Sequence, residues 1–432
     1  MAHAASKIAF RIYNLVWSTA IPFLRLNQRI SEGFSQKTLE TPLPRADIWI
    51  QAASGGEAYL ARSIIRRLSL PAFTRILLTA NTRQGLEILE KAAAEKAGGK
   101  EVSFFTAYFP FDRPDTMKKA VDSVQPRLMV LLELELWPGL LLALKEHACR
   151  TIILNGRITG KSLKHYLRFK EVWRFLKPDK IMAISPEDGK RFQNLFPSSQ
   201  VGLTPNIKFD ALVPDDEEPT GKEGRGFFLP PEAPSVILGS VREEEEAVAL
   251  KIIQKLFQKK PEAIIGLIPR HLHRTPHWRE ALTKAGIPFL IRSGLTGPVS
   301  KGNVILWDIF GELTTAYSLF KAAFVGGTLA PLGGQNFLEP LICGVRPVIG
   351  PSWENFRWVG EDVIQEGLVR IGKEWEIVAD ILLDDLDRPE DRAQVKHQVS
   401  FYLNKRKGGV DMACGLIHEA LSLSSHKESK GP

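Results

Sequence analysis

The sequence predicts an α/β protein with two domains, each built around a doubly wound parallel sheet. From Asp47 onward, short apolar runs alternate with helix-like stretches, a rhythm typical of strands joined by helical crossovers. The 432 residues suffice for two domains of roughly 200 residues, each with its own core. The polar, turn-rich run 213–226 interrupts the rhythm and is the best linker candidate. Because such sheets bind ligands at the carboxyl ends of their strands, we expect a ligand cleft between the domains.

The strands of the first domain are predicted from apolar runs at 48–53, 75–79, 102–108, 128–132, 151–154 and 180–184. Helical segments of crossover length lie between them, at 57–68, 83–96, 113–124 and 137–147. The rhythm resumes in the second domain with strands at 236–239, 263–268, 304–307, 323–325 and 347–349. The predicted parts are an N-terminal segment 1–45, a first domain 46–212, the linker 213–226, a second domain 227–420 and a frayed polar tail 421–432.

Composition excludes several classes of protein. The three cysteines, Cys149, Cys343 and Cys414, have no ligand spacing, which indicates a reducing compartment and argues against both a disulfide framework and a zinc site. The sequence contains no HExxH motif, EF-hand loop or Walker loop. The net charge of +8 suits an anionic partner, but basic residues lie among acidic ones, and no motif supports nucleic-acid binding.

The N-terminal segment contains an apolar, aromatic run at 8–24 with basic residues on both sides. It is near the lower length limit for a membrane span, and Arg11 and Pro22 interrupt it. No small-residue cleavage site follows, so a secretory signal is not expected. We expect residues 1–45 to associate with a membrane, either spanning it or lying in its interface; the alternative is a buried N-terminal helix.

Carboxylates follow two predicted strands of the first domain. Gly55 and Gly56 permit a sharp turn, and Glu57 then lies on the first turn of a helix, where it can act as a general base toward a hydroxyl. The alternative role for Glu57 is charge matching at the helix N-terminus. Glu133 directly follows a buried apolar run, where an unpaired carboxylate is costly, so it should have a basic partner or a task. Glu135 can be a simple capping group.

Lys208 lies just before the linker, next to the predicted cleft. It can neutralise a leaving phosphate or a negative charge on an acceptor, although a surface lysine is the alternative.

In the second domain, the apolar segment 322–325 reads as a buried strand, and the run 326–340 after it reads as a loop with four glycines and a helix start. A helix N-terminus offers unpaired N–H groups to phosphate, and Asn336 and Glu339 can hydrogen-bond ribose hydroxyls. The alternative is a tight turn whose glycines serve packing alone. This run and its companions after neighbouring strands predict a nucleotide-sugar site.

Two of those companions carry charge. Arg270 ends a predicted strand and suits phosphate recognition, and Glu312 opens a helix where it can reach a base or a sugar hydroxyl. The strand-end loop 239–242 can also touch phosphate, whereas the acidic run 243–246 is predicted to be a solvated helix start.

Seven motifs together resemble the 3-deoxy-D-manno-octulosonic acid (Kdo) transferases of lipopolysaccharide assembly. They run in order over most of the chain: Gly55-Gly56-Glu57, the E-L-E-L-W-P run 133–138, Asn155-Gly156-Arg157, Lys208-Phe209-Asp210, Pro269-Arg270-His271, Gly311-Glu312 and the G-G-Q-N-F-L-E run 333–339. The resemblance implies two Rossmann-like domains of the GT-B glycosyltransferase kind, attached to the cytoplasmic side of the inner membrane. It also implies transfer of Kdo from CMP-Kdo to a lipid A precursor of the lipid IVA type.

The resemblance assigns roles by motif. Glu57 would be the general base, and Glu133 and Lys208 would support the transition state. The CMP site would be lined by Pro269, Arg270, Phe310, Gly311, Glu312, Asn336, Phe337, Leu338 and Glu339. Candidate contacts for acceptor phosphates, or ordinary exposed helix faces, are Arg62, Arg66, Arg67, Lys161, Lys164, Arg168, Lys170 and Arg174. Because a leaving nucleoside monophosphate can be stabilised by helix N-termini and Arg270, and no D-x-D loop follows a strand, we expect neither a metal nor another cofactor.

Three positions depart from the family pattern. Gln51 and Gln335 stand where the family commonly has His, and Val241 opens a run where it has Thr-His-x-Gly-Glu-Glu. Gln can hydrogen-bond as His does but cannot become cationic near neutral pH. Two alternatives therefore stay open: another GT-B enzyme, with a different donor or acting as a sugar-nucleotide epimerase, and a membrane-bound member without turnover. The retained Glu57 and the N-terminal segment favour an active transferase.

Overall fold

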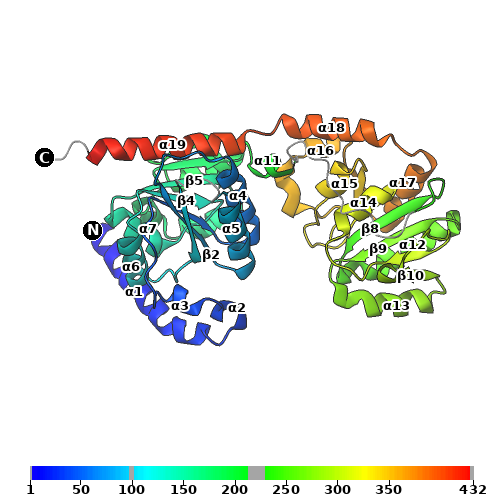
Figure 1. The fold of residues 1–432 in the computed structure, drawn as a ribbon, viewed down its shortest axis with the longest axis horizontal. Helices are drawn as coiled ribbons and strands as arrows, with labels where there is room; N and C mark the ends of the chain where they lie inside the picture. The colour runs from blue at the N-terminus through cyan, green and yellow to red at the C-terminus, as the bar shows by residue number, and fades with distance from the viewer. Residues whose placement is uncertain (1, 97–101, 213–228, 429–432) are drawn as a thin grey trace. The chain divides into compact units, whose positions relative to one another are not determined.

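The computed structural model describes residues 2–96, 102–212 and 229–428, and the predicted linker 213–226 lies outside them. The chain forms two compact units, residues 1–211 with 406–432 and residues 212–405 (Figure 1). Each unit contains a seven-stranded parallel sheet, so the predicted pair of doubly wound α/β domains is confirmed.

The sheet of the first unit has the order β3-β2-β1-β4-β5-β6-β7. Its strands are β1 Ile48–Ala52, β2 Arg75–Ala80, β3 Ser103–Tyr108, β4 Leu128–Leu132, β5 Arg150–Gly156, β6 Lys180–Ala183 and β7 Gln200–Leu203. β1 pairs with β2 on one side and with β4 on the other, so the chain reverses its direction of winding between β1 and β4. Such a topological switch point opens a crevice at the carboxyl ends of the two strands.

Helices cover both faces of this sheet because each helix turns an apolar side toward it. One face packs against α4 (Gly55–Arg67), α5 (Arg83–Lys96) and α19 (Gly409–Glu428). The other packs against α6 (Pro114–Val124), α7 (Pro138–Glu146), α9 (Lys170–Phe175) and α10 (Pro186–Leu195). The short helices α8 (Gly160–Leu167) and α11 (Lys208–Leu212) complete the unit.

The N-terminal segment is helical, with α1 (Ala2–Leu24), α2 (Gln28–Ser31) and α3 (Phe34–Lys37). α1 is joined to the first unit by polar and aromatic contacts: the Tyr13 hydroxyl donates to Asp112 at 2.9 Å, and the Trp17 and Phe111 rings lie 5.7 Å apart. Within residues 2–96, 102–212 and 229–428, none of the helices combines the length and apolar character needed to cross a bilayer.

The last helix corrects the predicted domain boundary at residue 420. Residues from 406 onward belong to the first unit, where α19 lies along α4 and β5 (Figure 1). Asp210 accepts hydrogen bonds from the backbone N–H groups of Gly408 and Gly409 at 2.9 and 3.0 Å, and Ile417 is fully buried. α19 thus completes one face of the first sheet, and its helical backbone continues through most of the predicted frayed tail.

The sheet of the second unit has the order β10-β11-β9-β8-β12-β13-β14. Its strands are β8 Ser235–Val241, β9 Ile264–Pro269, β10 Phe289–Ile291, β11 Val304–Leu306, β12 Ala322–Val325, β13 Pro347–Ile349 and β14 Arg370–Ile371. Its α-helices are α12 Glu246–Lys259, α13 Thr275–Lys284, α14 Leu313–Leu319, α15 Leu338–Ile342, α16 Asp362–Gln365, α17 Trp375–Asp387 and α18 Arg392–Asn404. α12, α13 and α17 pack on one face, and the switch point lies between β8 and β12.

Candidate active site

Glu57 lies on the first turn of α4, directly after β1, as predicted. Its carboxylate accepts hydrogen bonds from the Ser54 backbone N–H at 2.7 Å and the Ser54 hydroxyl at 3.0 Å, forming a capping box. Burial raises the pKa of Glu57, and the Ser54 hydrogen bonds lower it. The negative charge of Glu133 also raises this pKa, and the positive charge of Lys208 lowers it. The carboxylate is therefore fixed in position and has a higher affinity for protons than a solvated one.

Glu133 follows β4 and has the basic partner that the sequence predicted. The Lys208 ammonium donates to its carboxylate at 2.6 Å, and both side chains are largely buried. The backbone of Glu133 has a φ of 54°, a left-handed conformation that is uncommon for a residue with a side chain. Such conformations persist where the surrounding structure enforces them, often at functional sites.

Two buried asparagines hold the segment that presents Lys208. Asn155, at the end of β5, accepts a hydrogen bond from the Ile207 N–H at 2.9 Å, and Asn206 accepts one from the Lys208 N–H at 3.0 Å. Within the described chain, neither side-chain amide nitrogen has a hydrogen-bond partner. Asn155 belongs to the Asn-Gly-Arg motif, but nothing in that motif predicts this positioning task.

Glu135 is buried and does not cap α7, whose N-cap is Trp137. Its carboxylate instead accepts a hydrogen bond from the Trp137 indole at 2.6 Å. Burial, and next the charge of Glu57, raise the pKa of Glu135 to about 7, while hydrogen bonds from Trp137 and Gln51 oppose the shift. A third carboxylate therefore belongs to the electrostatic environment of Glu57.

Gln51, the last buried polar residue before the β1 turn, belongs to a hydrogen-bonded chain that the sequence did not reveal. The Thr79 hydroxyl donates to its side-chain oxygen at 2.6 Å, and its amide nitrogen donates to Asn81 at 3.0 Å. The Trp49 indole in turn donates to Thr79 at 2.8 Å. Gln51 is fully buried, so this network fixes its amide beside Glu135.

Glu57 and Glu133 thus follow the two strands that flank the first switch point, β1 and β4. The effects of Glu133 and Lys208 on the pKa of Glu57 indicate that the three side chains lie close together. Their arrangement can remove a proton from a hydroxyl and place a cation beside developing negative charge.

The glycine-rich loop of the second unit follows β12, at the corresponding switch point. Gly327, Gly333 and Gly334 have φ values of 71°, 80° and 85°, which favour glycine. A Cβ on Gly326 would lie 2.5 Å from the Ser240 carbonyl oxygen, so this glycine is needed for close approach to the end of β8. The loop therefore requires several of its glycines for its own conformation.

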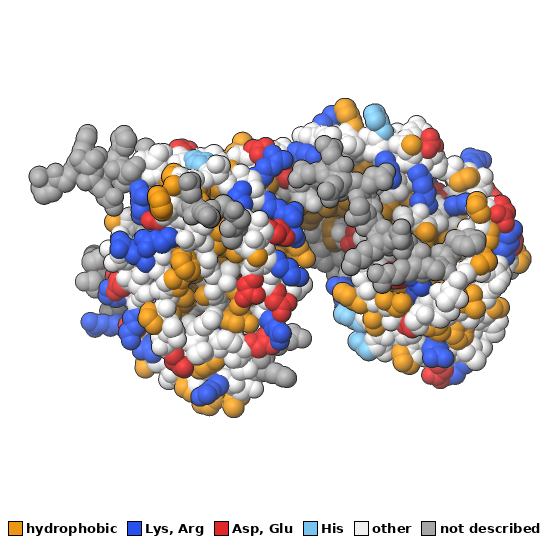
Figure 2. Space-filling view, in the orientation of Figure 1, with side chains coloured by type: hydrophobic (Ala, Val, Ile, Leu, Met, Phe, Trp, Pro, Cys, Tyr) orange, Lys and Arg blue, Asp and Glu red, His pale blue; other side chains and the backbone are white. Residues whose placement is uncertain are grey.

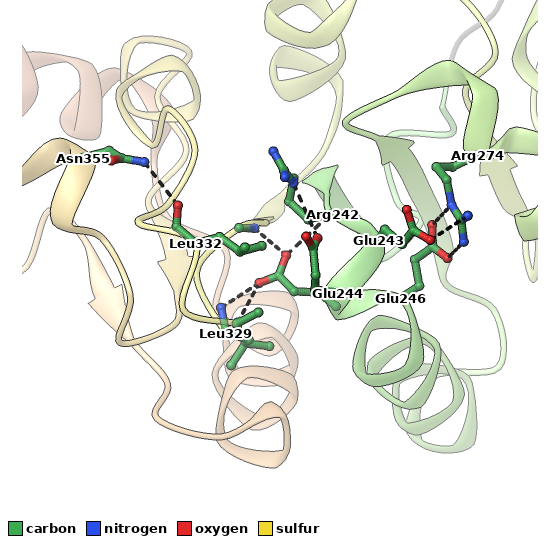
Figure 3. Close-up of polar contacts among 11 residues, drawn as sticks. Arg242, Glu243, Glu244, Glu246, Arg274, Leu329, Leu332 and Asn355 are labelled. Carbon is green, nitrogen blue, oxygen red and sulfur yellow. Dashed lines mark hydrogen bonds and ion pairs between the residues drawn. The ribbon is translucent and has the colours of Figure 1, made fainter.

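Glu245 holds that loop, which corrects the prediction of a solvated acidic run. Its carboxylate is fully buried and accepts hydrogen bonds from the backbone N–H groups of Gly327, Leu329 and Ala330, the last two at 2.7 and 3.2 Å. Glu246 is also buried, and Arg274 bridges it to Glu243 (Figure 3). Glu245 is buried because the loop N–H groups would otherwise lack acceptors, whereas Glu243 and Glu244 are exposed as predicted.

Three further residues, all missed from the sequence, support the loop through contacts distant in the chain. The Thr328 hydroxyl accepts from the Gly350 N–H at 2.8 Å, and the Ser352 hydroxyl accepts from the Gly333 N–H at 2.8 Å. The Asn355 amide donates to the Leu332 carbonyl oxygen at 3.3 Å (Figure 3).

The comparisons with known proteins identify the family. A model of 3-deoxy-D-manno-octulosonic-acid transferases (kdotransferases) matches residues 25–211. The 3-deoxy-D-manno-octulosonic acid transferase of Haemophilus influenzae is 31% identical over 337 residues, which cover 77% of this chain and 77% of that protein. The chain belongs to the Kdo transferase family.

A second relative extends beyond the aligned region. The bifunctional glycosyltransferase/methyltransferase of Fusobacterium nucleatum is 28% identical over 373 residues, which cover 82% of this chain but only 56% of that protein. A solved glycosyltransferase from Rickettsia africae covers 88% of this chain, with a TM-score of 0.56 at 10% identity. The fold is that of the GT-B glycosyltransferases, and as a Kdo transferase family member the chain is a glycosyltransferase.

The predicted nucleotide-site residues of this Kdo transferase family member include polar side chains that solvent reaches and apolar side chains that are buried. The Asn336 amide donates to Glu339 at 2.9 Å, and burial raises the pKa of Glu339 while Asn336 and Arg270 lower it. Arg270, Asn336 and Glu339 therefore lie near one another at strand ends. The side chains of Pro269, Phe337 and Leu338 are buried and belong to the core.

Glu312 is held by a residue that the sequence analysis missed. The buried Arg292 guanidinium donates to both of its oxygens, at 2.9 and 3.1 Å, and the Trp307 indole donates at 3.1 Å. Beside it, Gly311 has a φ of 88°, and the Phe310 side chain is 81% exposed.

The positions that depart from the family pattern are packed or hydrogen-bonded within their own units. Gln51 and Val241 are buried, and the Gln335 N–H donates to the Gly326 carbonyl oxygen at 3.2 Å. Of the candidate phosphate contacts, Arg62 and Arg66 pair with Glu95, whereas the group on α8 and α9 is exposed. On the face drawn in Figure 2, basic and acidic side chains are interspersed over both units.

Proposed function

We propose that this chain transfers Kdo from CMP-Kdo to a hydroxyl of a lipid A precursor, with Glu57 as the general base. The observation that carries the proposal is the grouping of Glu57 with the Glu133–Lys208 ion pair at the first switch point. Membership of the Kdo transferase family supports the identity of the transferred sugar.

In the proposed reaction, Glu57 removes the proton of the acceptor hydroxyl as its oxygen attacks the anomeric carbon of Kdo. The bond from that carbon to the phosphate oxygen breaks, and CMP leaves with the bonding electrons. The raised pKa of Glu57 strengthens it as a base, and the Ser54 hydrogen bonds keep it oriented. Lys208, held by Glu133, supplies positive charge where negative charge develops.

The donor would bind to the second unit, where Arg270 contacts the CMP phosphate and Asn336 and Glu339 contact the ribose. Glu245 already occupies three N–H groups of the glycine-rich loop, so cationic side chains carry phosphate recognition. Arg242, Arg270 and His271 lie near one another at the ends of β8 and β9. Burial lowers the pKa of His271 most, and the positive charges of both arginines lower it further. These groups compensate a leaving monophosphate, and the proposal requires no metal.

We further propose that α1 docks on the cytoplasmic face of the inner membrane, where the lipid acceptor is found. Its exposed apolar side chains follow helical spacing and so form one stripe: Ile12, Leu15, Val16, Phe23 and, just beyond the helix, Leu26. Neighbouring α8 and α9 add the exposed Phe169 and the basic side chains Lys164, Arg168 and Lys170. Aromatic and basic side chains on one surface suit an anionic leaflet.

A radiolabel transfer assay tests the reaction. Purified full-length protein, CMP-Kdo generated in situ and a tetraacylated lipid A precursor in detergent should give labelled lipid, and product mobility would count the sugars added. The absence of transfer by a folded protein that binds CMP would reject this donor–acceptor pair. Transfer of another sugar nucleotide would redirect the proposal to a different donor.

Vesicle flotation tests the docking surface. Phe23→Ser should weaken partition onto vesicles containing anionic lipid by roughly 10-fold, because one buried aromatic ring contributes about 1.5–3 kcal/mol. Phe73→Ser is the matched control, since Phe73 is 85% exposed and lies in the loop before β2, outside the stripe. Equal partition of the two variants would reject the stripe as the docking surface.

A further inference from the structure

The second unit has a pocket at the amino-terminal ends of its strands, whereas the glycine-rich loop follows the carboxyl end of β12. Lys321 directly precedes β12, Arg346 directly precedes β13, and Arg370 opens β14. The cavity volume of the pocket is about 40 Å³, and the pocket opens to solvent. No part of the proposed reaction uses it.

The lining of this pocket contains more positive than negative charge. Lys321, Arg346, Arg370 and Arg392 line it, opposed by the two carboxylates Asp385 and Glu390. Arg346 donates to Glu390 at 2.8 Å, and Arg370 is paired with Asp385. These two ion pairs leave Lys321 and Arg392, and therefore two positive charges, without compensation from the lining.

Arg392 is the more unusual of the two. Its guanidinium donates to the carbonyl oxygens of Ser318 and Phe320 and, in the described part of the chain, has no carboxylate partner. Burial lowers its pKa, which reflects the cost of keeping this charge away from water. The Nε atoms of Arg346 and Arg370 are likewise buried, and the described residues offer them no acceptor. Two residues that line the pocket thus carry a buried donor without an acceptor among the described residues.

Tight packing keeps these groups in place. Gly344 has a φ of 78°, and a Cβ there would lie 2.7 Å from the Arg392 carbonyl oxygen. The turn before β13 therefore packs directly against the start of α18. An anion that enters the pocket would offset the two positive charges that the lining carboxylates leave uncompensated.

We propose that this pocket binds a small, soluble phosphorylated anion. Two uncompensated positive charges match the dianionic form of a phosphate monoester, whereas a single carboxylate would neutralise only one. Guanidinium groups present planar pairs of donors that fit phosphate oxygens. Because the pocket opens to solvent, atoms attached to a bound phosphoryl group can extend out of it. The site differs from the proposed CMP site because it lies at the amino-terminal ends of the strands, whereas the CMP site is proposed at their carboxyl ends.

Calorimetric titration of the full chain tests this assignment, with inorganic phosphate and glycerol 3-phosphate as probes at constant ionic strength and neutral pH. The background variant Arg270→Gln removes the phosphate contact proposed for the CMP site. Both probes should bind saturably to this background. Lys321→Gln and Arg392→Gln should each weaken binding by about 10-fold or more, as expected for the loss of a charged hydrogen-bond partner.

Matched controls are Lys259→Gln and Arg279→Gln, exposed basic residues of the same unit that lie outside the pocket, and both should leave binding unchanged. If Arg392→Gln unfolds, Lys321→Gln decides alone, because its ammonium has no ion pair in the described chain. No saturable binding to the background variant, or equal weakening by the controls, would overturn the proposal. Tighter binding of dihexanoyl phosphatidic acid, by an order of magnitude, would overturn the soluble ligand in favour of a lipid headgroup.

Discussion

Glu57 and Glu245 occupy comparable places in the two units and have opposite environments. Each is a carboxylate shortly after the first strand of its sheet, beside a switch point. Glu57 is half-buried, and among the described residues Ser54 alone donates hydrogen bonds to its carboxylate. Glu245 is fully buried and satisfied by the N–H groups of a loop. Position in the fold therefore does not decide the role of a carboxylate; the number of fixed donors and access to solvent do.

The largest effect is expected for Glu57→Gln. Gln at this position can still close the capping box, but it cannot accept a proton, so kcat should fall by roughly 10²–10⁴-fold while the melting temperature stays the same. The Kdo transfer assay and thermal unfolding measure the two quantities. Glu87→Gln, an exposed carboxylate on α5, is the control. A Glu57→Gln variant with near-wild-type kcat would remove the distinction between the two glutamates.

A somewhat smaller loss should follow Lys208→Met, which removes the cation beside Glu133. We expect kcat to fall by about 10²-fold, the size typical of losing one charge-stabilising donor. Because the pair acts as a unit, Glu133→Gln combined with Lys208→Met should cost much less than the product of the two single effects. Independent, multiplicative effects would mean that the ion pair has no joint task.

Glu245→Gln should instead reduce stability. An amide there offers one fewer oxygen to the loop N–H groups and directs its own donors at them, which should cost about 1–3 kcal/mol in the free energy of unfolding of the second unit. Urea unfolding monitored by hydrogen exchange in residues 326–334 measures the loss. The neighbouring Glu244→Gln is the control, since Glu244 is exposed. Unchanged exchange in the Glu245 variant would contradict a structural role.

The smallest effects are shifts of the pH profile. A base must be deprotonated, so kcat/KM should fall as the pH drops below the raised pKa of Glu57. Glu133→Gln removes a negative neighbour and should move this acid limb to lower pH. Lys208→Met removes a positive neighbour and should move it to higher pH. Shifts in the same direction for both variants would argue that another group controls the acid limb.

Sequence periodicity located the buried strands well and missed three of the four edge strands. The predicted run 128–132 coincides with β4, which is fully buried. β7, β10 and β14 were missed because they are short, and none of their residues is buried. An edge strand buries fewer of its side chains, so fewer of its positions need to be apolar. Its sequence pattern therefore resembles that of a loop.

The site was predictable where a local motif carried the chemistry. Glu57 and its Ser54 cap lie three residues apart, and the need of Glu133 for a partner followed from its apolar surroundings. Glu245, Arg292 and Asn355 were misjudged or missed because their partners lie 20 to 85 residues away in the chain. Only the fold brings such residues together, so their polar character alone indicated solvent exposure.

The return of α19 to the first unit has a consequence for the order of folding during synthesis. A ribosome that has produced residue 211 has made seven strands but not the helix whose Val410 and Ile417 close one face of their sheet. α4 and α5 already cover part of that apolar face, but the part beneath α19 stays uncovered until the entire second unit has been translated. The second unit, continuous in sequence, can therefore finish folding before the first, the reverse of the usual N-to-C order.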